Sequence, residues 1–254
     1  MKKSIKLLSV LFLGISLFSA STNAASAQDS SDPALKQQYQ DYVNQGAIDS
    51  SSISYDDWVE SYLSSKEIEA SFPNVSAASS KKGQVVSPAY TEMKPGDIFV
   101  TNDAEYNGLV GHTAIAISST AILQMTGPNK PSDILSYGEF KKKYNKSGKH
   151  IWIYRHANAS VGQKAADWAR RHYWNYNGGS QQTLLPHYKI NNNLYSTDPS
   201  YCSKLVWQAY YNTSPSYIRP PLFKIVAPYT LMPSRSNLWN VEPKLVATVT
   251  NYSN

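Results

Sequence analysis

One cysteine, Cys202, occurs in the 254-residue chain, and its surroundings suggest a chemical role. It lies in TDPSYCSKLVWQAYY, where Asp198 and Pro199 suit the N-cap and first position of a helix. In the first turn, the free N–H groups and positive helix end would lower the pKa of the thiol and could hold an oxyanion. We therefore treat Cys202 as a candidate nucleophile, against the alternative that it is a small buried side chain.

A thiol that attacks an amide or ester needs a base, and histidine is the usual one. Of the five histidines, His112 opens an expected strand, HTAIAIS, after the glycine-containing NGLVG. A rigid strand end beside a loop could present this ring to a cleft, although a lone histidine is more often structural. His150 and His156 bracket another expected strand and either could be exposed. His172 is expected on a helix surface, and His187 in the loop before the cysteine helix.

Three motifs, PGDI, GHTAIAI and YCSKLVWQAY, follow one another within roughly residues 88–211. In this order and spacing they resemble the circularly permuted branch of the NlpC/P60 papain-like cysteine hydrolases, particularly the YycO/YiiX-like group. In that branch the histidine strand precedes the cysteine helix. The resemblance implies a permuted papain-like fold with an antiparallel sheet packed against helices, Cys202 as the nucleophile and His112 as the general base.

The resemblance also implies a third catalytic residue on the next strand, often a carboxylate, and the matching residue is Gln124 in AILQMTG. A glutamine can accept from the imidazole N–H and fix its tautomer, but it stabilises imidazolium less well than a carboxylate does. The alternative is a solvent-facing strand residue. Tyr201 and Ser203 flank the thiol and could shape an oxyanion site, although helix surface and capping turn is the simpler interpretation. Asp97 in PGDI is expected to stabilise a turn.

The N-terminal 27 residues have the composition of a signal peptide. Three lysines precede an apolar run from Leu7 to Phe18, and Ala25-Ser26-Ala27 is a cleavage signature. We expect cleavage after Ala27 and a secreted protein. Since residues 1–27 hold three lysines and no acid, the net charge would fall from +6 to +3. That excess favours loose cell-wall association and is too small to suggest nucleic-acid binding.

Two further parts are expected after the signal peptide. The pattern of residues 28–84 predicts a helical hairpin followed by a linker near residues 72–84. The first helix is expected to end at Gly46, and the second to begin at the Ser54–Asp57 capping pattern. Residues 85–254 predict the catalytic domain, with a Pro-rich C-terminal tail. The class is α+β. Strands are expected at 96–101, 112–118, 121–127 and 150–156, and helices in SDILSYGEFKKKY, capped by Ser132, and in SVGQKAADWARRHYW.

The sequence predicts no metal site, no phosphate loop and no cofactor, and one cysteine excludes an internal disulfide. The leading hypothesis is a secreted, monomeric cysteine peptidase or amidase that cleaves amide bonds in cell-wall peptide, with peptidoglycan as substrate. One alternative is a lipid-directed acyltransferase or thioesterase of the same fold, for which the tail YIRPPLFKIVAPYTLM could supply an apolar lip. Another is a secreted binding module without turnover.

Overall fold

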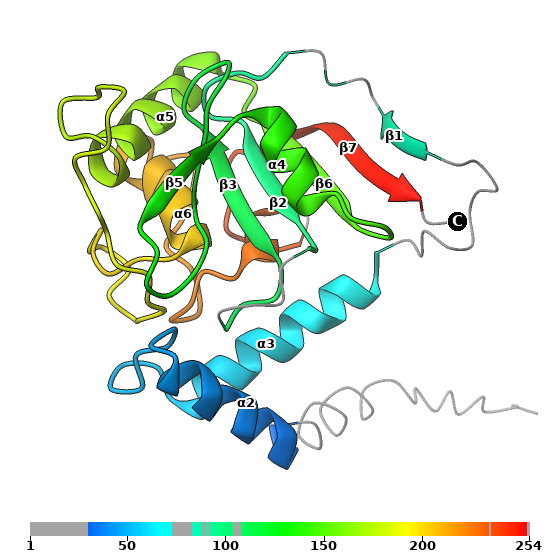
Figure 1. The fold of residues 1–254 in the computed structure, drawn as a ribbon, viewed down its shortest axis with the longest axis vertical. Helices are drawn as coiled ribbons and strands as arrows, with labels where there is room; N and C mark the ends of the chain where they lie inside the picture. Colours follow the sequence, from blue (N-terminus) through cyan, green and yellow to red (C-terminus); the bar gives the residue numbers. More distant parts are fainter. Residues whose placement is uncertain are drawn as a thin grey trace, which may run out of the picture.

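The computed structural model describes residues 30–72, 83–87, 90, 92–103, 108–233 and 235–252. Its centre is a seven-stranded antiparallel sheet with the strand order β1-β7-β6-β2-β3-β4-β5 (Figure 1). The strands and the helices around them confirm the α+β class. The strands are β1 (Gly83–Ser87), β2 (Ile98–Thr101), β3 (His112–Ala116), β4 (Ile122–Met125), β5 (Ser132–Leu135), β6 (His150–Arg155) and β7 (Lys244–Tyr252).

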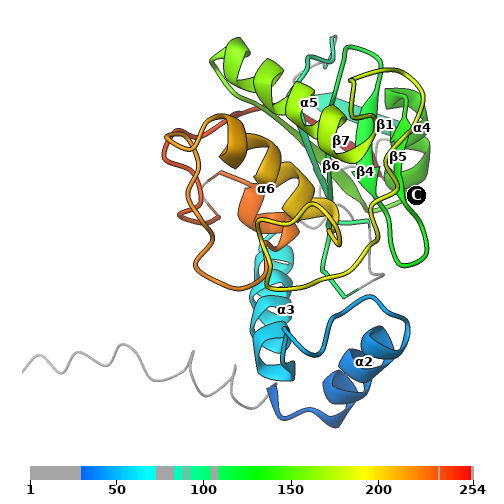
Figure 2. The same ribbon diagram turned by 90° about the vertical axis from the view of Figure 1, so that its left-hand side faces the viewer.

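Helices cover both faces of the sheet, with α4 on one face and α5 and α6 on the other (Figure 2). Alternation along the strands explains this arrangement, because successive side chains point to opposite faces. Val100 and Ile115 pack with α5 and α6, whereas Phe99 and Ala114 pack with Phe140 of α4. The helices are α2 (Pro33–Asn44), α3 (Tyr55–Ala70), α4 (Tyr137–Tyr144), α5 (Ala159–Tyr173) and α6 (Cys202–Thr213), with a 3-10 turn η2 (Pro228–Leu231).

The start of α4 differs from the sequence expectation. Ser132 is not its cap, because residues Ser132–Leu135 pair with β4 as an edge strand. Ser136 caps the helix instead, and its hydroxyl and the Glu139 carboxylate form a reciprocal capping box. The capping box that the sequence predicts at Ser54 and Asp57 is confirmed at the start of α3.

The start of α6 also differs from the expectation that Asp198 is its N-cap. The Asp198 carboxylate accepts from the His187 backbone and ring, and the Ser200 backbone pairs with the His187–Lys189 segment. This bridge holds Ser200 in extended conformation, so the helix begins only at Cys202, after Tyr201. Cys202 nevertheless lies in the first turn, as the sequence predicts.

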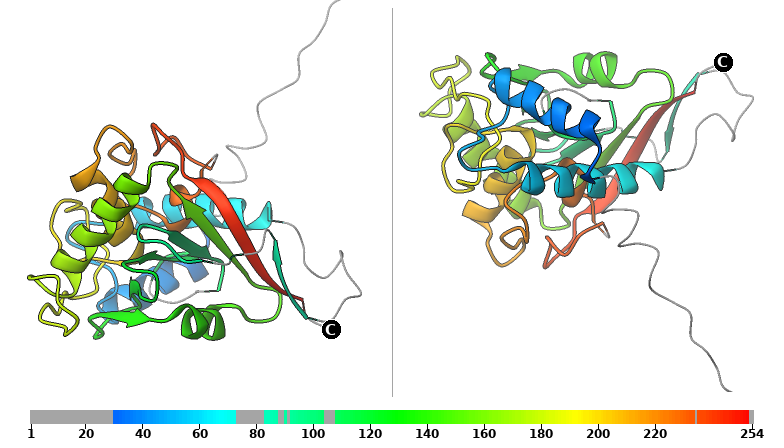
Figure 3. Two further views of the ribbon diagram at one scale, coloured as in Figure 1. Left: turned by 90° about the horizontal axis from the view of Figure 1, so that it is seen from above. Right: turned by 90° about the horizontal axis from the view of Figure 1, so that it is seen from below.

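The helical hairpin α2–α3 lies below the sheet in Figure 1, and Figure 3 shows it from above and from below. Buried contacts join it to the core. Trp58 is fully buried, and its indole N–H donates to the Gly108 carbonyl over 2.8 Å. Ile48, after α2, bridges Ile190 in the loop before α6. The hairpin is therefore packed against the core. Of the expected linker, residues 73–82 lie outside the described residues, and β1 already begins at Gly83.

The expected signal peptide, residues 1–27, lies outside the described residues, so secretion stays a prediction. Within the described residues, no helix has the length and apolarity needed to cross a membrane.

The PGDI turn attaches α5 to the sheet. The Asp97 carboxylate accepts from the Lys94 backbone N–H and from the Arg155 guanidinium, which confirms its turn-stabilising role. Gly96 has a φ of +85° and lies against Gly162 of α5, so that a Cβ on Gly96 would lie 2.3 Å from the Gly162 Cα. Only glycine fits here, because both the conformation and the space exclude a side chain.

We expect Gly96→Ala to destabilise the protein by about 3 kcal/mol or more, since a left-handed backbone and a backbone clash act together. Gly46→Ala is the matched control, because Gly46 has a φ of +75° with no atom within 4 Å of the added carbon. It should cost about 1 kcal/mol, the backbone strain alone. Urea unfolding measures the loss in unfolding free energy for each variant. Equal losses in Gly96→Ala and Gly46→Ala would contradict the packing argument.

Candidate active site

Cys202 and His112 line the same cavity, which has a volume of about 430 Å³. His112 is the first residue of β3, and Cys202 is the first residue of α6, which packs on β3. The two side chains come from opposite faces of the sheet, since the His112 ring packs with α4 and Cys202 belongs to the core beneath α6. Both line the cavity at the end of β3 where His112 lies.

The His112 ring is fixed by Gln124 and Tyr144. Its Nε2 lies 2.8 Å from Gln124 Oε1, which also accepts from the Tyr144 hydroxyl over 2.9 Å. The Tyr144 ring stacks on the imidazole with centroids 4.9 Å apart. A carbonyl oxygen only accepts, so Nε2 must carry the hydrogen and Nδ1 has the free lone pair. Gln124 thus has the orienting position that the resemblance implies for it, and it is fully buried rather than solvent-facing.

Burial makes His112 a neutral imidazole at pH 7. Burial lowers its pKa to about 4, although the hydrogen bond that the ring donates to Gln124 acts in the opposite direction, and the positive charge of Lys143 adds to the lowering. A neutral ring with a free Nδ1 can take a proton from a thiol or an amine. The arrangement therefore has the protonation state that a general base requires.

The structure corrects the expected state of the thiol. Burial raises the pKa of Cys202, although hydrogen bonds from the Thr113 and Ser203 backbones act in the opposite direction. The helix terminus therefore does not make a resting thiolate. The structure records no hydrogen bond between the Cys202 Sγ and the His112 ring, and the sulfur lies 3.9 Å from the Ser203 hydroxyl. Catalytic hydrogen bonds often tighten only when substrate is bound.

The N-terminus of α6 leaves backbone donors near the sulfur. Among the α-helices that the structure describes, α2 to α5 each have a side chain that caps their first turn, whereas α6 has none. Its first N–H groups therefore lack the usual side-chain acceptor. Beside Cys202 these amides are suited to hold the oxyanion of a tetrahedral intermediate.

Tyr201 and Ser203 do not lie as the sequence suggested. Both are fully buried, so the helix-surface interpretation is wrong, and neither lines the cavity. The Tyr201 hydroxyl accepts from the Val226 backbone N–H, and the Ser203 hydroxyl donates to the Val226 carbonyl. They attach the start of α6 to the C-terminal segment and thereby hold Cys202 in place.

The other four histidines lie outside the cavity. The sequence left open whether His150 or His156 is exposed, and the structure buries both, since they are only 7% and 3% exposed. The His150 ring contacts the Thr250 hydroxyl, and the His156 ring packs on Tyr217. His172 is on the surface of α5, as predicted. His187 is exposed and pairs with Asp198.

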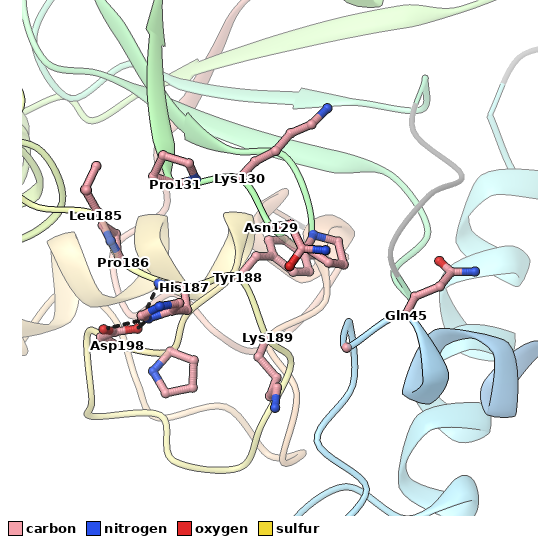
Figure 4. Close-up of a pocket in the computed structure, with 13 residues that line it drawn as sticks. Gln45, Asn129, Lys130, Pro131, Leu185, Pro186, His187, Tyr188, Lys189 and Asp198 are labelled. Atoms are coloured by element: carbon pink, nitrogen blue, oxygen red, sulfur yellow. Dashed lines mark hydrogen bonds and ion pairs between the residues drawn. The ribbon is translucent and has the colours of Figure 1, made fainter.

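A larger cavity of about 810 Å³ adjoins the first, and the two share Pro128, Lys130 and Tyr188. Figure 4 shows its walls, which come from the turn after α2, the β4–β5 loop and the loop before α6. Its apolar lining residues are Pro128, Pro131, Leu185, Pro186, Tyr188 and Pro199.

Sequence reasoning missed Tyr144, Thr113 and Tyr188. Tyr144 is four residues after the buried Phe140 on α4, so helical spacing could have placed it on the inner face. Thr113 follows the predicted base, and its backbone contact with the thiol has no sequence signal. No cluster of possible metal ligands is present in the part of the chain that the structure describes.

The family model described as "Lipoprotein N-acylation protein LnsA-like" matches residues 59–248. The chain is also 28% identical over 243 residues to an uncharacterized 30.3 kDa protein of Bacillus thuringiensis, a match that covers 83% of this chain and 87% of that protein. No solved structure matches the chain significantly. The family match runs from Val59 in α3 to Thr248 in β7 and includes His112, Gln124 and Cys202.

Protonation of His112 should destabilise the fold at low pH. Its pKa is about 4 in the native state and about 6.5 when unfolded, so only the unfolded state binds the proton between these values. Stability is therefore fully present above about pH 6.5 and falls by about 3 kcal/mol towards pH 4. Urea unfolding at pH 7 and at pH 4 gives the free energy of unfolding that each protein loses on acidification. The native protein should lose about 3 kcal/mol more than His112→Gln. An equal loss in the two proteins would exclude a buried neutral ring.

Proposed function

This chain belongs to the LnsA-like family of lipoprotein N-acylation proteins, and we propose that it is a thiol-dependent acyltransferase. It takes a fatty acyl group from an ester onto Cys202 and passes it to an amine. The family match supports the lipid-directed alternative from the sequence better than the peptidase hypothesis. We further propose a permuted papain-like core, since the histidine strand β3 precedes the cysteine helix α6.

In the first step, His112 Nδ1 takes the Cys202 proton as the sulfur attacks the ester carbonyl. The N–H groups at the start of α6 hold the oxyanion, and the hydrogen bond from Nε2 to Gln124 keeps the imidazolium oriented. Collapse of the intermediate breaks the C–O bond, and His112 returns the proton to the leaving alkoxide. The products are an alcohol and an acyl thioester on Cys202.

In the second step, the amine of the acceptor attacks the thioester and forms an amide. His112 takes a proton from the attacking amine and returns it to the departing sulfur, which restores the thiol. Cys202 and His112 are only 3% and 4% exposed, so little water reaches the thioester. This burial favours transfer to a bound amine over hydrolysis.

One observation carries the proposal: the Cys202 thiol, at the uncapped start of α6, and an imidazole held as the Nε2–H tautomer border one cavity. We place the acyl chain in the larger adjoining cavity, because its apolar wall is continuous with the thiol site through Pro128 and Tyr188. Each buried methylene would contribute about 0.8 kcal/mol to binding.

The purified protein should form an acyl-enzyme on Cys202 when mixed with an activated fatty acyl ester. Intact mass spectrometry should show the added acyl mass, and neutral hydroxylamine should remove it because the bond is a thioester. Cys202→Ala should show none. Added primary amine should yield amide faster than water yields free acid. Release of free acid alone would support a thioesterase. Absence of the acyl adduct from the native protein would contradict the acyltransferase proposal.

Leu185→Asp should lower acylation by a long-chain ester about tenfold and leave acetylation by an acetyl ester unchanged, since only the long chain reaches the larger cavity. Leu222→Asp is the matched control, because Leu222 is 85% exposed and lies outside both cavities. Acylation rates with both esters measure the effect. An equal loss for the two ester lengths would show that the larger cavity does not hold the chain.

A further inference from the structure

The two ends of the Gln124 amide have different surroundings. Its Oε1 accepts from His112 and Tyr144, whereas its Nε2 is buried without a hydrogen-bond partner among the described residues. A buried donor left without a partner costs about 1–3 kcal/mol. Because Gln124 orients the candidate base, an acceptor for its buried amide nitrogen is expected nearby.

The residue opposite Gln124 in the ladder of β4 and β5 is Asp133. Directly opposed residues of antiparallel strands have Cβ atoms about 4.5–5.5 Å apart on one face of the sheet. The Asp133 Oδ1 is also buried without a hydrogen-bond partner in the described part of the chain. An unpaired donor and an unpaired acceptor therefore face each other across the two strands.

We propose that Asp133 is a positioning residue that acts on His112 through Gln124. The Gln124 Nε2 donates to the Asp133 carboxylate, directly or through one water, and this bond keeps Oε1 turned towards His112. The amide dipole then lies between a negative charge and the ring. Asp133 thereby supplies, one residue further away, the charge that a glutamine lacks. The inference rests on the Cys202–His112 pair of the proposed function and not on its acyl donor.

The electrostatic surroundings agree with this arrangement. Burial raises the pKa of Asp133, while Lys143 and the Gln124 side chain favour its charged form. Lys143 lowers the pKa of His112, so the Asp133 charge offsets a cation that opposes protonation of the ring. The other charged and titratable groups of the cavity that His112 lines are Asp103, Lys130, Lys143, Tyr144, Lys146, Tyr188 and Cys202, and the cations that act on Asp133 are Lys143 and Lys130.

The test is Asp133→Asn, which keeps the shape and the acceptor oxygen but removes the charge. Cys202 alkylation by iodoacetamide and acylation by a soluble aryl ester are measured from pH 3.5 to pH 9. Both rates should fall about threefold, because a His112 pKa lower by about half a unit makes the ring a weaker base. The acid limb of each profile should move to lower pH by about half a unit, since Lys143 is no longer offset. Asp167→Asn, at an exposed site on α5 where the carboxylate accepts a hydrogen bond from Gln163, should match the native protein.

A charge-relocating double variant separates this role from a structural one. Gln124→Glu with Asp133→Asn moves the carboxylate next to the ring and keeps one acid in the cluster. Its rates should return to the native values or exceed them, and its acid limb should lie at higher pH than the native one, because the charge now contacts the imidazole. Urea unfolding verifies that each variant is folded.

The inference is overturned if Asp133→Asn and the native protein share the same rates and profiles. It is also overturned if Asp133→Asn slows both reactions without moving the acid limb and the double variant does not recover, since Asp133 is then structural. If alkylation shows the shift and the recovery while the native protein forms no acyl-enzyme, the positioning role stands and the proposed acyl transfer fails.

Discussion

The site depends on one buried hydrogen bond, between His112 Nε2 and Gln124 Oε1. In water this bond would contribute little, but around an enclosed ring it decides which nitrogen carries the hydrogen. The strand register places it, because β3 and β4 form a tight hairpin that sets Ile115 opposite Leu123. The chemistry of the cavity therefore follows from the pairing of two short strands.

Burial has opposite effects on the two reacting groups and produces a neutral pair. It raises the pKa of the thiol and lowers that of the imidazole, so neither group is charged before substrate arrives. In the proposed mechanism, charge appears only as the sulfur attacks, when the helix amides and the Gln124 oxygen can stabilise it. Such an arrangement stabilises the transition state more than the resting state, as catalysis requires.

Much of the scaffold could be predicted from sequence, because the signals are local. Strand alternation, the Ser54 capping box and the strand of His112 all depend on neighbouring residues. The errors arose where contacts between segments distant in sequence determine where a strand or helix begins. Ser132 joins β5 because β4 is beside it, and α6 starts late because the His187 segment pairs with Ser200. The thiol pKa and the Asp133 contact depend on burial and register, which no local pattern contains. The hydrolase hypothesis depended on motifs that hydrolases and acyltransferases share, and such motifs do not show whether water or an amine accepts the acyl group.

The α2–α3 turn contributes Gln45 and Gly46 to the wall of the larger cavity, and the Ala47 carbonyl accepts from the Ile190 N–H. The segment that borders the proposed acyl-chain space is thus separate in sequence from Cys202 and His112, the proposed reacting residues. Selection could alter this turn, and with it the proposed lipid preference, while the proposed reaction stays intact. Substrate preference and bond chemistry can therefore diverge independently among homologues of this fold.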